Sequence, residues 1–160
     1  RAARGGTLRR WGAGLGPATL CFLVGGAVCG RGRGGIVEPV AALPKLPLLL
    51  LKPEFGVPTP WAYQRWCDSR ELAGIDYAPQ SLGELIFEND LERPVFEKYL
   101  FLARMKEWLR AQPEVAVALL SGSGSTMLAV LNEAEAADAL AARARLELDP
   151  ALWTCATAIR

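Results

Sequence analysis

The sequence predicts a domain of the α+β class, in which an antiparallel sheet carries helices on one face. The first reason is the pattern after Pro47, where short apolar runs typical of strands alternate with longer segments of helical periodicity. The second reason is composition, because 51% of the 160 residues are hydrophobic and 22% are charged. Such a chain is long and apolar enough to form a globular core.

The first part of the chain differs from the rest. Residues 1–16 show no usable periodicity and remain unassigned, whereas Leu20–Val24, Ala27–Cys29 and Ile36–Val40 are predicted as short strands. Residues 30–34 alternate Gly and Arg and are predicted as a flexible basic loop. Residues 1–33 hold six of the 18 basic residues and none of the 17 acidic ones.

The segment that follows is predicted as a buried strand and a helix. Leu48–Lys52 is a mostly apolar run bounded by prolines, which predicts a central strand. Thr59 suits the N-cap of a helix and Pro60 its first position. This helix would carry three aromatic residues, Trp61, Tyr63 and Trp66.

The remaining elements are predicted from caps and periodicity. Ser81–Glu84 has the spacing of a capping box, which predicts a helix near 82–92, and Pro94 predicts another over 94–111. Asn132 with Glu135 is expected to cap a helix over 133–147. The strands predicted in this part are Val115–Leu120, Met127–Leu131 and Trp153–Ile159.

Charge and composition exclude several functions. A net charge of +1 argues against nucleic acid as the main partner. The chain has no histidine, which excludes histidine-based acid–base or nucleophilic catalysis. The four cysteines, at 21, 29, 67 and 155, form no C-x-x-C pair. We therefore expect no metal site, and reduced thiols in a cytoplasmic protein.

One alternative concerns export. The apolar segment Pro17–Gly30 follows two arginines, as a signal peptide would, and this leaves open a secreted α+β binding protein. The segment is too short to span a membrane, and Gly25-Gly26 suits a turn better than an apolar helix. No membrane partner is expected.

The segment between the two strands near the C-terminus is a candidate anion site. Its glycines allow a sharp turn that exposes several backbone N–H groups, and its hydroxyls add donors. The alternative is an ordinary hairpin linker. The candidate phosphate-binding residues are Ser121, Gly122, Ser123, Gly124, Ser125 and Thr126.

Two further segments are candidates for binding. In Gly56–Tyr63, an aromatic ring of Trp61 or Tyr63 could stack on a planar base, although packing in the core is the alternative. Asn89–Glu92 is a polar patch whose simplest interpretation is a solvated or capping cluster.

The order of these motifs resembles a known family. The motifs are L-G-P-A-T-L-C-F-L (15–23), G-G-A (25–27), G-R-G-R-G (30–34), E-P-V (38–40), K-P (52–53), G-V-P-T-P-W-A-Y (56–63), N-D-L-E (89–92) and S-G-S-G-S-T (121–126). They are similar to the GHMP superfamily of small-molecule kinases, and within it to the diphosphocytidyl-methylerythritol kinases of non-mevalonate isoprenoid synthesis. No single motif is specific, but their order and spacing are.

The resemblance implies a fold, an activity and a site. Residues 44–160 would form the ferredoxin-like C-terminal GHMP domain, and residues 1–43 would be the tail of the N-terminal domain. The family transfers the γ-phosphate of ATP, with Mg²⁺, to the 2-hydroxyl of a cytidine-diphosphate-linked methylerythritol. Residues 121–126 match its third motif, near the phosphates. Thr59, Pro60 and Tyr63 match part of its cytidine pocket.

Two departures from the family pattern bear on activity. The family's general base is an aspartate, and its position is occupied by Ala18. The family's P-x-x-x-G-L-G-S-S-type ATP loop has no counterpart in the chain. We therefore expect the chain alone to be inactive, either as part of a kinase or as a non-catalytic nucleotide-binding remnant. Residues 1–20 could also be out of frame. Oligomeric state is left open.

Overall fold

The computed structural model describes residues 28–31, 36–40 and 43–159. The chain divides into two units, residues 1–45 with Arg160, and residues 46–159. In the first unit, β1 (Val28–Arg31) and β2 (Ile36–Pro39) pair as an antiparallel ribbon. The motif positions before residue 28, Ala18 included, lie outside the described residues.

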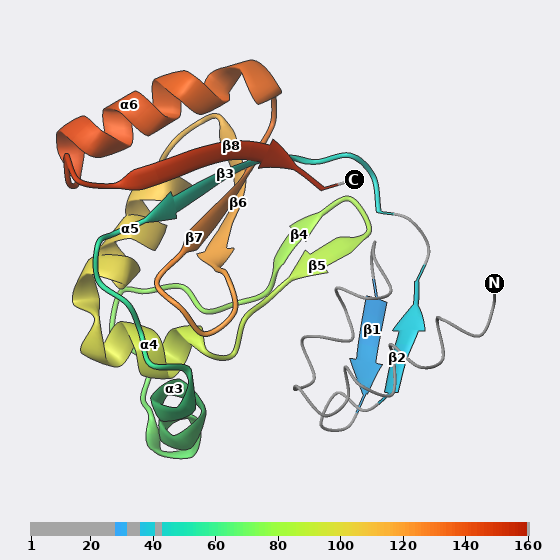
Figure 1. The fold of residues 1–160 in the computed structure, drawn as a ribbon, viewed down its shortest axis with the longest axis vertical. Coiled ribbons are helices and arrows are strands. Elements are labelled where there is room, and N and C mark those ends of the chain that lie inside the picture. Colours follow the sequence, from blue (N-terminus) through green and yellow to red (C-terminus); the bar gives the residue numbers. More distant parts are fainter. Residues whose placement is uncertain (1–27, 32–35, 41–42, 160) are drawn as a thin grey trace, which may run out of the picture. The chain divides into compact units, whose positions relative to one another are not determined.

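The second unit is built on a four-stranded antiparallel sheet (Figure 1). Its strands are β3 (Pro47–Lys52), β6 (Val115–Leu120), β7 (Met127–Leu131) and β8 (Trp153–Ala158). The spatial order β6-β7-β3-β8 and the intervening helices are those of a ferredoxin-like layer. The predicted α+β fold, with an antiparallel sheet, is confirmed.

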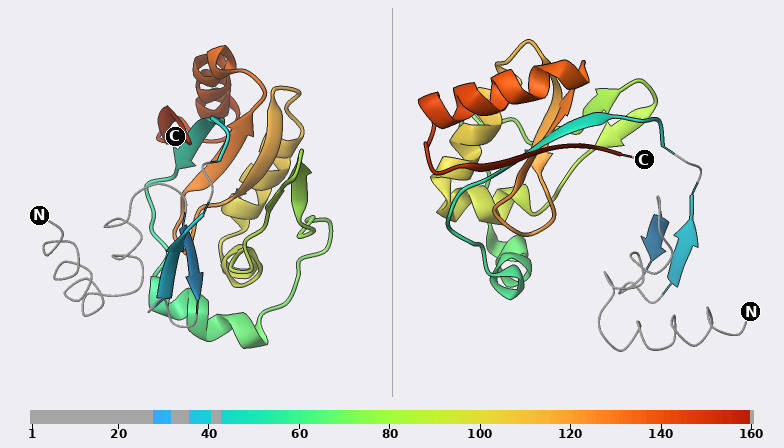
Figure 2. Two further views of the ribbon diagram at one scale, coloured as in Figure 1. Left: turned by 90° about the vertical axis from the view of Figure 1, so that its right-hand side faces the viewer. Right: turned by 45° about the horizontal axis from the view of Figure 1, so that its top comes forward.

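The two longest helices cover one face of this sheet. They are α5 (Leu100–Arg110) and α6 (Ala137–Glu147), and both contact the strands (Figure 1, Figure 2). The shorter helical elements are two α-helices, α3 (Thr59–Arg65) and α4 (Glu92–Lys98), and two single-turn 3₁₀ segments, η1 (Trp66–Asp68) and η2 (Ala134–Ala136). Among the described residues, no helix is long and apolar enough to cross a membrane.

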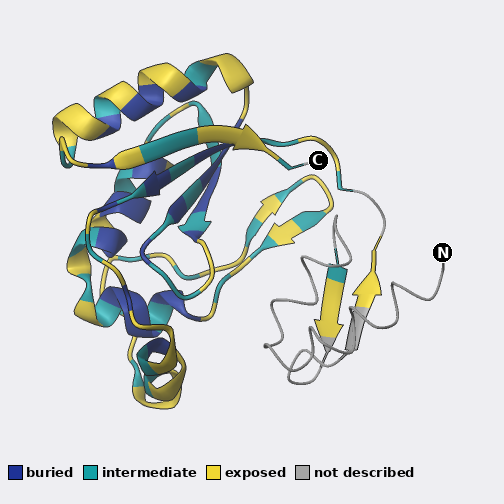
Figure 3. Cartoon of the chain, in the orientation of Figure 1, coloured by how far each residue is buried: buried dark blue, intermediate teal, exposed yellow. Residues whose placement is uncertain are grey.

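The core lies between the sheet and these helices, as the buried positions in Figure 3 show. Alternate strand residues point into it because successive side chains of a strand face opposite sides of the sheet. Its buried side chains include Leu49, Leu51, Leu120, Met127 and Leu131 from the strands, and Phe96, Leu102, Met105, Leu109 and Leu140 from the helices.

The opposite face of the sheet is covered differently. Leu48, Val117 and Val130 form a second, smaller cluster there. A β-hairpin of β4 (Gln80–Leu82) and β5 (Leu85–Phe87) contributes Leu82 and Phe87 to it.

The prediction of a helix near 82–92 is wrong, since residues 80–87 form the β4–β5 hairpin and the next helix, α4, begins only at Glu92. Leu82 pairs with Leu85, and Gly83 has φ +60°. A glycine with positive φ at the first of two central residues meets the requirement of a type II′ hairpin turn. The Ser-x-x-Glu spacing of 81–84 thus spans a turn and does not cap a helix.

The single helix predicted over 94–111 is broken in two. Tyr99, with φ −108° and ψ 70°, separates α4 from α5. Its ring stacks on Phe55 at a centroid distance of 5.5 Å and meets Trp61 edge-on at 5.8 Å. This aromatic packing accompanies the non-helical backbone at Tyr99.

Two predicted caps are also corrected. Asn132 does not cap a helix, because its Nδ2 donates to the carbonyl of Pro113 and the α-helix begins only at Ala137. Thr59 is the first residue of α3 and Pro58 is the N-cap. The Thr59 hydroxyl is therefore available for another partner.

Candidate functional site

The loop between β6 and β7 is closed at its base and open at its tip. The N–H of Ser121 donates to the carbonyl of Thr126 at 2.8 Å, and Gly122 has φ +63°. Within residues 43–159, none of the backbone N–H groups of residues 122–126 donates a hydrogen bond. Several unpaired N–H groups in one tight loop form the kind of concavity that binds anions.

The loop hydroxyls have different partners. Ser123 Oγ lies 2.8 Å from Thr59 Oγ1, so the structure brings together two predicted site segments that are far apart in the sequence. Ser125 is buried and donates its hydroxyl to the carbonyl of Phe55 at 2.6 Å. The proton of the Ser125 hydroxyl is thus used inside the fold, and only its N–H remains for a ligand.

A cavity of about 480 Å³ lies beside α3. Tyr63 is 63% exposed and Trp66 is 40% exposed, and both line it. Trp61 is instead engaged with Tyr99 and with the Lys98 ammonium, 4.5 Å from its ring centroid. Tyr63 is therefore the helix aromatic free to stack on a flat ligand. The other lining residues are Glu88, Asn89, Asp90 and Leu91.

Asn89 connects this cavity to the loop. Its Nδ2 donates to the carbonyls of Leu120 and Gly122, both at 2.7 Å. Its Oδ1 accepts from the N–H of Leu91 at 3.0 Å, which fixes the orientation of the amide. The side chain of Asn89 is thus an internal brace of the loop, rather than part of a solvated patch.

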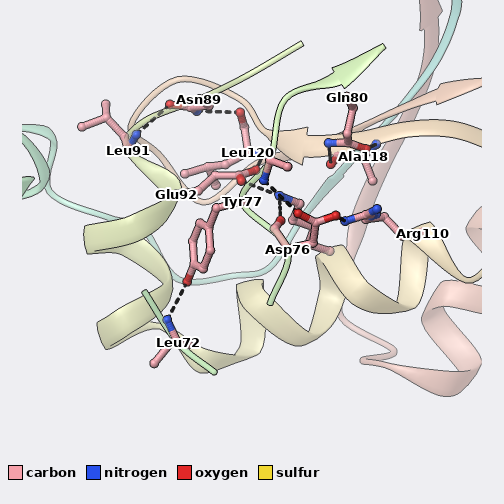
Figure 4. A network of polar contacts seen from close by, with 12 residues as sticks. Leu72, Asp76, Tyr77, Gln80, Asn89, Leu91, Glu92, Arg110, Ala118 and Leu120 are labelled. Atoms are coloured by element: carbon pink, nitrogen blue, oxygen red, sulfur yellow. Dashed lines mark hydrogen bonds and ion pairs between the residues drawn. The ribbon is translucent and has the colours of Figure 1, made fainter. Parts of the chain in front are cut away.

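Glu92 continues this brace at the edge of β6 (Figure 4). Its Oε1 accepts from the N–H of Leu120 at 2.8 Å, and its Oε2 pairs with Lys106 Nζ at 2.6 Å. Lys106 also donates to the carbonyl of Asp76 at 2.6 Å. Glu92 and Lys106 are almost fully buried, so each charge depends on the other for compensation.

The surroundings set the acidity of two carboxyl groups in this network. Burial raises the pKa of Glu92, and the hydrogen bond from Lys106 partly opposes that rise. At the surface, the N–H of Ala78 and the guanidinium of Arg110 lower the pKa of Asp76. Asp76 and Arg110 form an ion pair at 2.6 Å.

Side chains also complete the outer edge of β6. Gln80 receives the N–H of Ala118 on Oε1 at 3.0 Å and donates from Nε2 to its carbonyl at 2.7 Å. Asn89 and Glu92 do the same for the carbonyl and N–H of Leu120. The edge of β6 at Ala118 and Leu120 is therefore hydrogen-bonded without a neighbouring strand.

Residues 77–148 match the family model described as the GHMP kinases C terminal. The chain carries a GHMP kinase C-terminal domain. A curated relative from Methylacidiphilum infernorum, named 4-diphosphocytidyl-2-C-methyl-D-erythritol kinase, is 34% identical over 149 residues, which cover 91% of this chain and 52% of that protein.

Other relatives agree with this assignment. A protein of the same name from Synechococcus sp. (strain JA-2-3B'a(2-13)) is 32% identical over 159 residues, covering 88% of this chain and 50% of that protein. A crystal structure of 4-(cytidine 5'-diphospho)-2C-methyl-D-erythritol kinase matches with a TM-score of 0.69 and 26% identity, over 94% of this chain and 56% of that one. The chain spans about half the length of the curated relatives it matches.

In the GHMP kinase C-terminal domain, the candidate residues form one neighbourhood. Thr59 contacts the loop 121–126, and Tyr63 lines the cavity that Asn89 joins to that loop. Pro60 is exposed in the first turn of α3. The part played by Asn89, Glu92 and Lys106 was not predicted from the sequence, in which the polar N-D-L-E segment was the one local sign of it.

Among the described residues, no group of three or more His, Cys, Asp or Glu could hold a metal ion. Mg²⁺ at sites of phosphate transfer is commonly held by one or two carboxylates together with the phosphates, and we assign none of the described residues to it. The three described cysteines, Cys29, Cys67 and Cys155, are free thiols.

Proposed function

We propose that the chain supplies the substrate-holding C-terminal domain of an ATP-dependent small-molecule kinase acting in the cytoplasm. The substrate is 4-diphosphocytidyl-2-C-methyl-D-erythritol, and the accepting group is its 2-hydroxyl. ATP and Mg²⁺ enter this proposal through the family, not through residues described in the structure. The proposal is supported by the relatives' names and by the joined cavity and loop.

The observation that carries the proposal is the contact between Thr59 and Ser123. It brings the first turn of α3, which leads to Tyr63, next to a loop with free N–H groups. A base stacked on Tyr63 and a diphosphate bound by residues 122–126 would then belong to one ligand. A cytidine diphosphate has both parts.

Tyr63→Ala is expected to weaken the binding of cytidine 5'-diphosphate by about tenfold or more, since a stacked base contributes about 1–3 kcal/mol. Isothermal titration calorimetry of the 160-residue chain measures this. Trp153→Ala is the matched control, because Trp153 is an exposed aromatic that does not line the cavity. Equal affinities of Tyr63→Ala and the parent would show that the base does not lie on Tyr63.

We also expect the 160-residue chain to transfer no phosphate from ATP to the cytidine substrate. Alanine at position 18 can accept no proton from the attacking hydroxyl, where the family has a carboxylate. A coupled assay of ADP formation with Mg²⁺ tests this. Binding without turnover is the result expected both for a part of a kinase and for a non-catalytic nucleotide-binding remnant, whereas substrate-dependent ADP formation would contradict the expectation.

A further inference from the structure

We infer that Asn89 is a positioning residue, which aims the N–H groups of the 121–126 loop outward by holding the loop's carbonyls inward. This inference rests on the proposed function, because it concerns how the same loop would receive a diphosphate. Asn89 does not itself offer a free donor to the ligand, since both bonds of Nδ2 go to carbonyls.

The geometry of the peptide unit links the direction of the Gly122 carbonyl to that of the Ser123 N–H. In a trans peptide, the carbonyl of one residue and the N–H of the next point in opposite directions. No cis peptide occurs in the described part of the chain. When Asn89 holds the carbonyl of Gly122 toward the protein, the N–H of Ser123 must therefore point away from Asn89.

Asn89 also holds a second carbonyl, at the base of the loop. The carbonyl of Leu120 is bound by Asn89, and the next N–H, that of Ser121, closes the loop on Thr126. The base of the loop is therefore fixed at the same time as its tip is oriented. Gly122 lies between these two points with φ +63°, a conformation that glycine adopts without strain.

The chemistry of the amide suits this task. A carbonyl oxygen turned toward a diphosphate would repel it, whereas an N–H would attract it, so the direction of one peptide plane changes the sign of the interaction. Asn89 can orient the plane because its Oδ1 is held by the N–H of Leu91, which leaves both hydrogens of Nδ2 facing the loop.

The position of Asn89 is itself fixed by a backbone contact with Glu92. Its carbonyl accepts from the N–H of Glu92 at 3.0 Å. The carboxylate of Glu92 binds the N–H of Leu120 and is neutralised by Lys106. Residue 120 is thus held on both backbone groups, by a carboxylate and by an amide, immediately before the loop starts.

The test compares two ligands and two amide residues. Cytidine and cytidine 5'-diphosphate are titrated into the parent chain, Asn89→Ala and Gln80→Ala. Gln80 is the matched control, since it also binds a backbone N–H and carbonyl of β6, but at Ala118, away from the loop. Asn89→Ala is expected to lower the affinity for cytidine 5'-diphosphate by about tenfold or more. The affinity for cytidine is expected to fall by less than about twofold.

The outcomes separate this inference from the proposed function. Selective loss of diphosphate affinity in Asn89→Ala, without such loss in Gln80→Ala, supports the positioning role. Equal weakening of both ligands, or the same selective loss in Gln80→Ala, overturns it. If the parent binds both ligands equally, the loop does not receive the diphosphate and the inference fails, while the base pocket stands. If the parent binds neither, the proposed function fails as well.

A second measurement does not depend on a ligand. The backbone amide resonance of Ser123 is followed by ¹H–¹⁵N NMR in the free parent chain and in both variants. We expect it to shift or broaden in Asn89→Ala and to stay in place in Gln80→Ala. An unchanged Ser123 amide in Asn89→Ala would show that the loop keeps its orientation without the brace.

Discussion

Lys106→Met is expected to lower the free energy of unfolding by about 3–5 kcal/mol. The reason is that methionine fills the space of the lysine stem but leaves the Glu92 carboxylate buried without its cation. The carbonyl of Asp76 loses its donor in the same step. Urea unfolding followed by tryptophan fluorescence measures the loss, because the domain has tryptophans on α3 and α5.

The cost of Lys106→Met should depend on pH. A buried carboxyl with a raised pKa destabilises the fold little below its unfolded pKa, and the penalty grows as pH rises through the folded pKa. The difference between parent and variant should therefore be larger at pH 7 than near pH 4. A difference independent of pH would contradict an unpaired charge as the cause.

Two controls accompany this substitution. Arg104→Met lies on the same helix but is exposed, and we expect a change within about 0.5 kcal/mol. Glu92→Gln combined with Lys106→Met removes both charges, and the glutamine oxygen can still accept from the N–H of Leu120. This double variant should recover much of the stability. Additive losses would instead indicate that the two residues act independently.

Phe96→Ala is expected to destabilise the domain by about 3–5 kcal/mol as well, through a cavity rather than a charge. Phe96 is fully buried on α4, with its ring centroid 6.1 Å from that of Tyr77. The Lys106 ammonium lies 5.9 Å from its ring centroid. Calorimetric or urea unfolding measures the loss.

Two controls accompany Phe96→Ala. One removes less side-chain volume at the same position, and the other removes an apolar side chain at an exposed position. Phe96→Leu keeps most of the apolar volume and should cost clearly less than the alanine variant. Ile86→Ala removes an apolar side chain that is 69% exposed, and its effect should stay within about 0.5 kcal/mol. A loss below about 1 kcal/mol in Phe96→Ala would show that α4 does not pack as described.

The sheet could be predicted from the sequence because each strand carries its own signal. In Leu48–Leu51 every residue is apolar, and the structure buries both faces, one against the helices and one against the smaller cluster. The hairpin at 80–87 could not be predicted in the same way, since its short strands depend on Gln80 binding β6 and on Leu82 and Phe87 packing across the sheet.

The candidate site shows the same limit. Gly and Ser in residues 121–126 indicate a turn rich in donors, but local pattern does not tell which hydroxyls are used. That depends on Thr59 and Phe55, which are distant in sequence. The pair Glu92–Lys106 joins two separate helices, so no periodicity within either helix marks it. Contacts of this kind follow from the tertiary arrangement.

The strand order also constrains how the domain can fold. β6 and β7 are joined by a short loop and can pair early, as local hairpins do. The central strand β3 has no such local partner: Leu50 pairs with Leu128 on one side and with Cys155 on the other. During synthesis, β3 therefore leaves the ribosome long before either neighbour exists. The sheet is complete only when β8, the last strand in the sequence, pairs with β3. We therefore expect this pairing to be a late, slow step of folding.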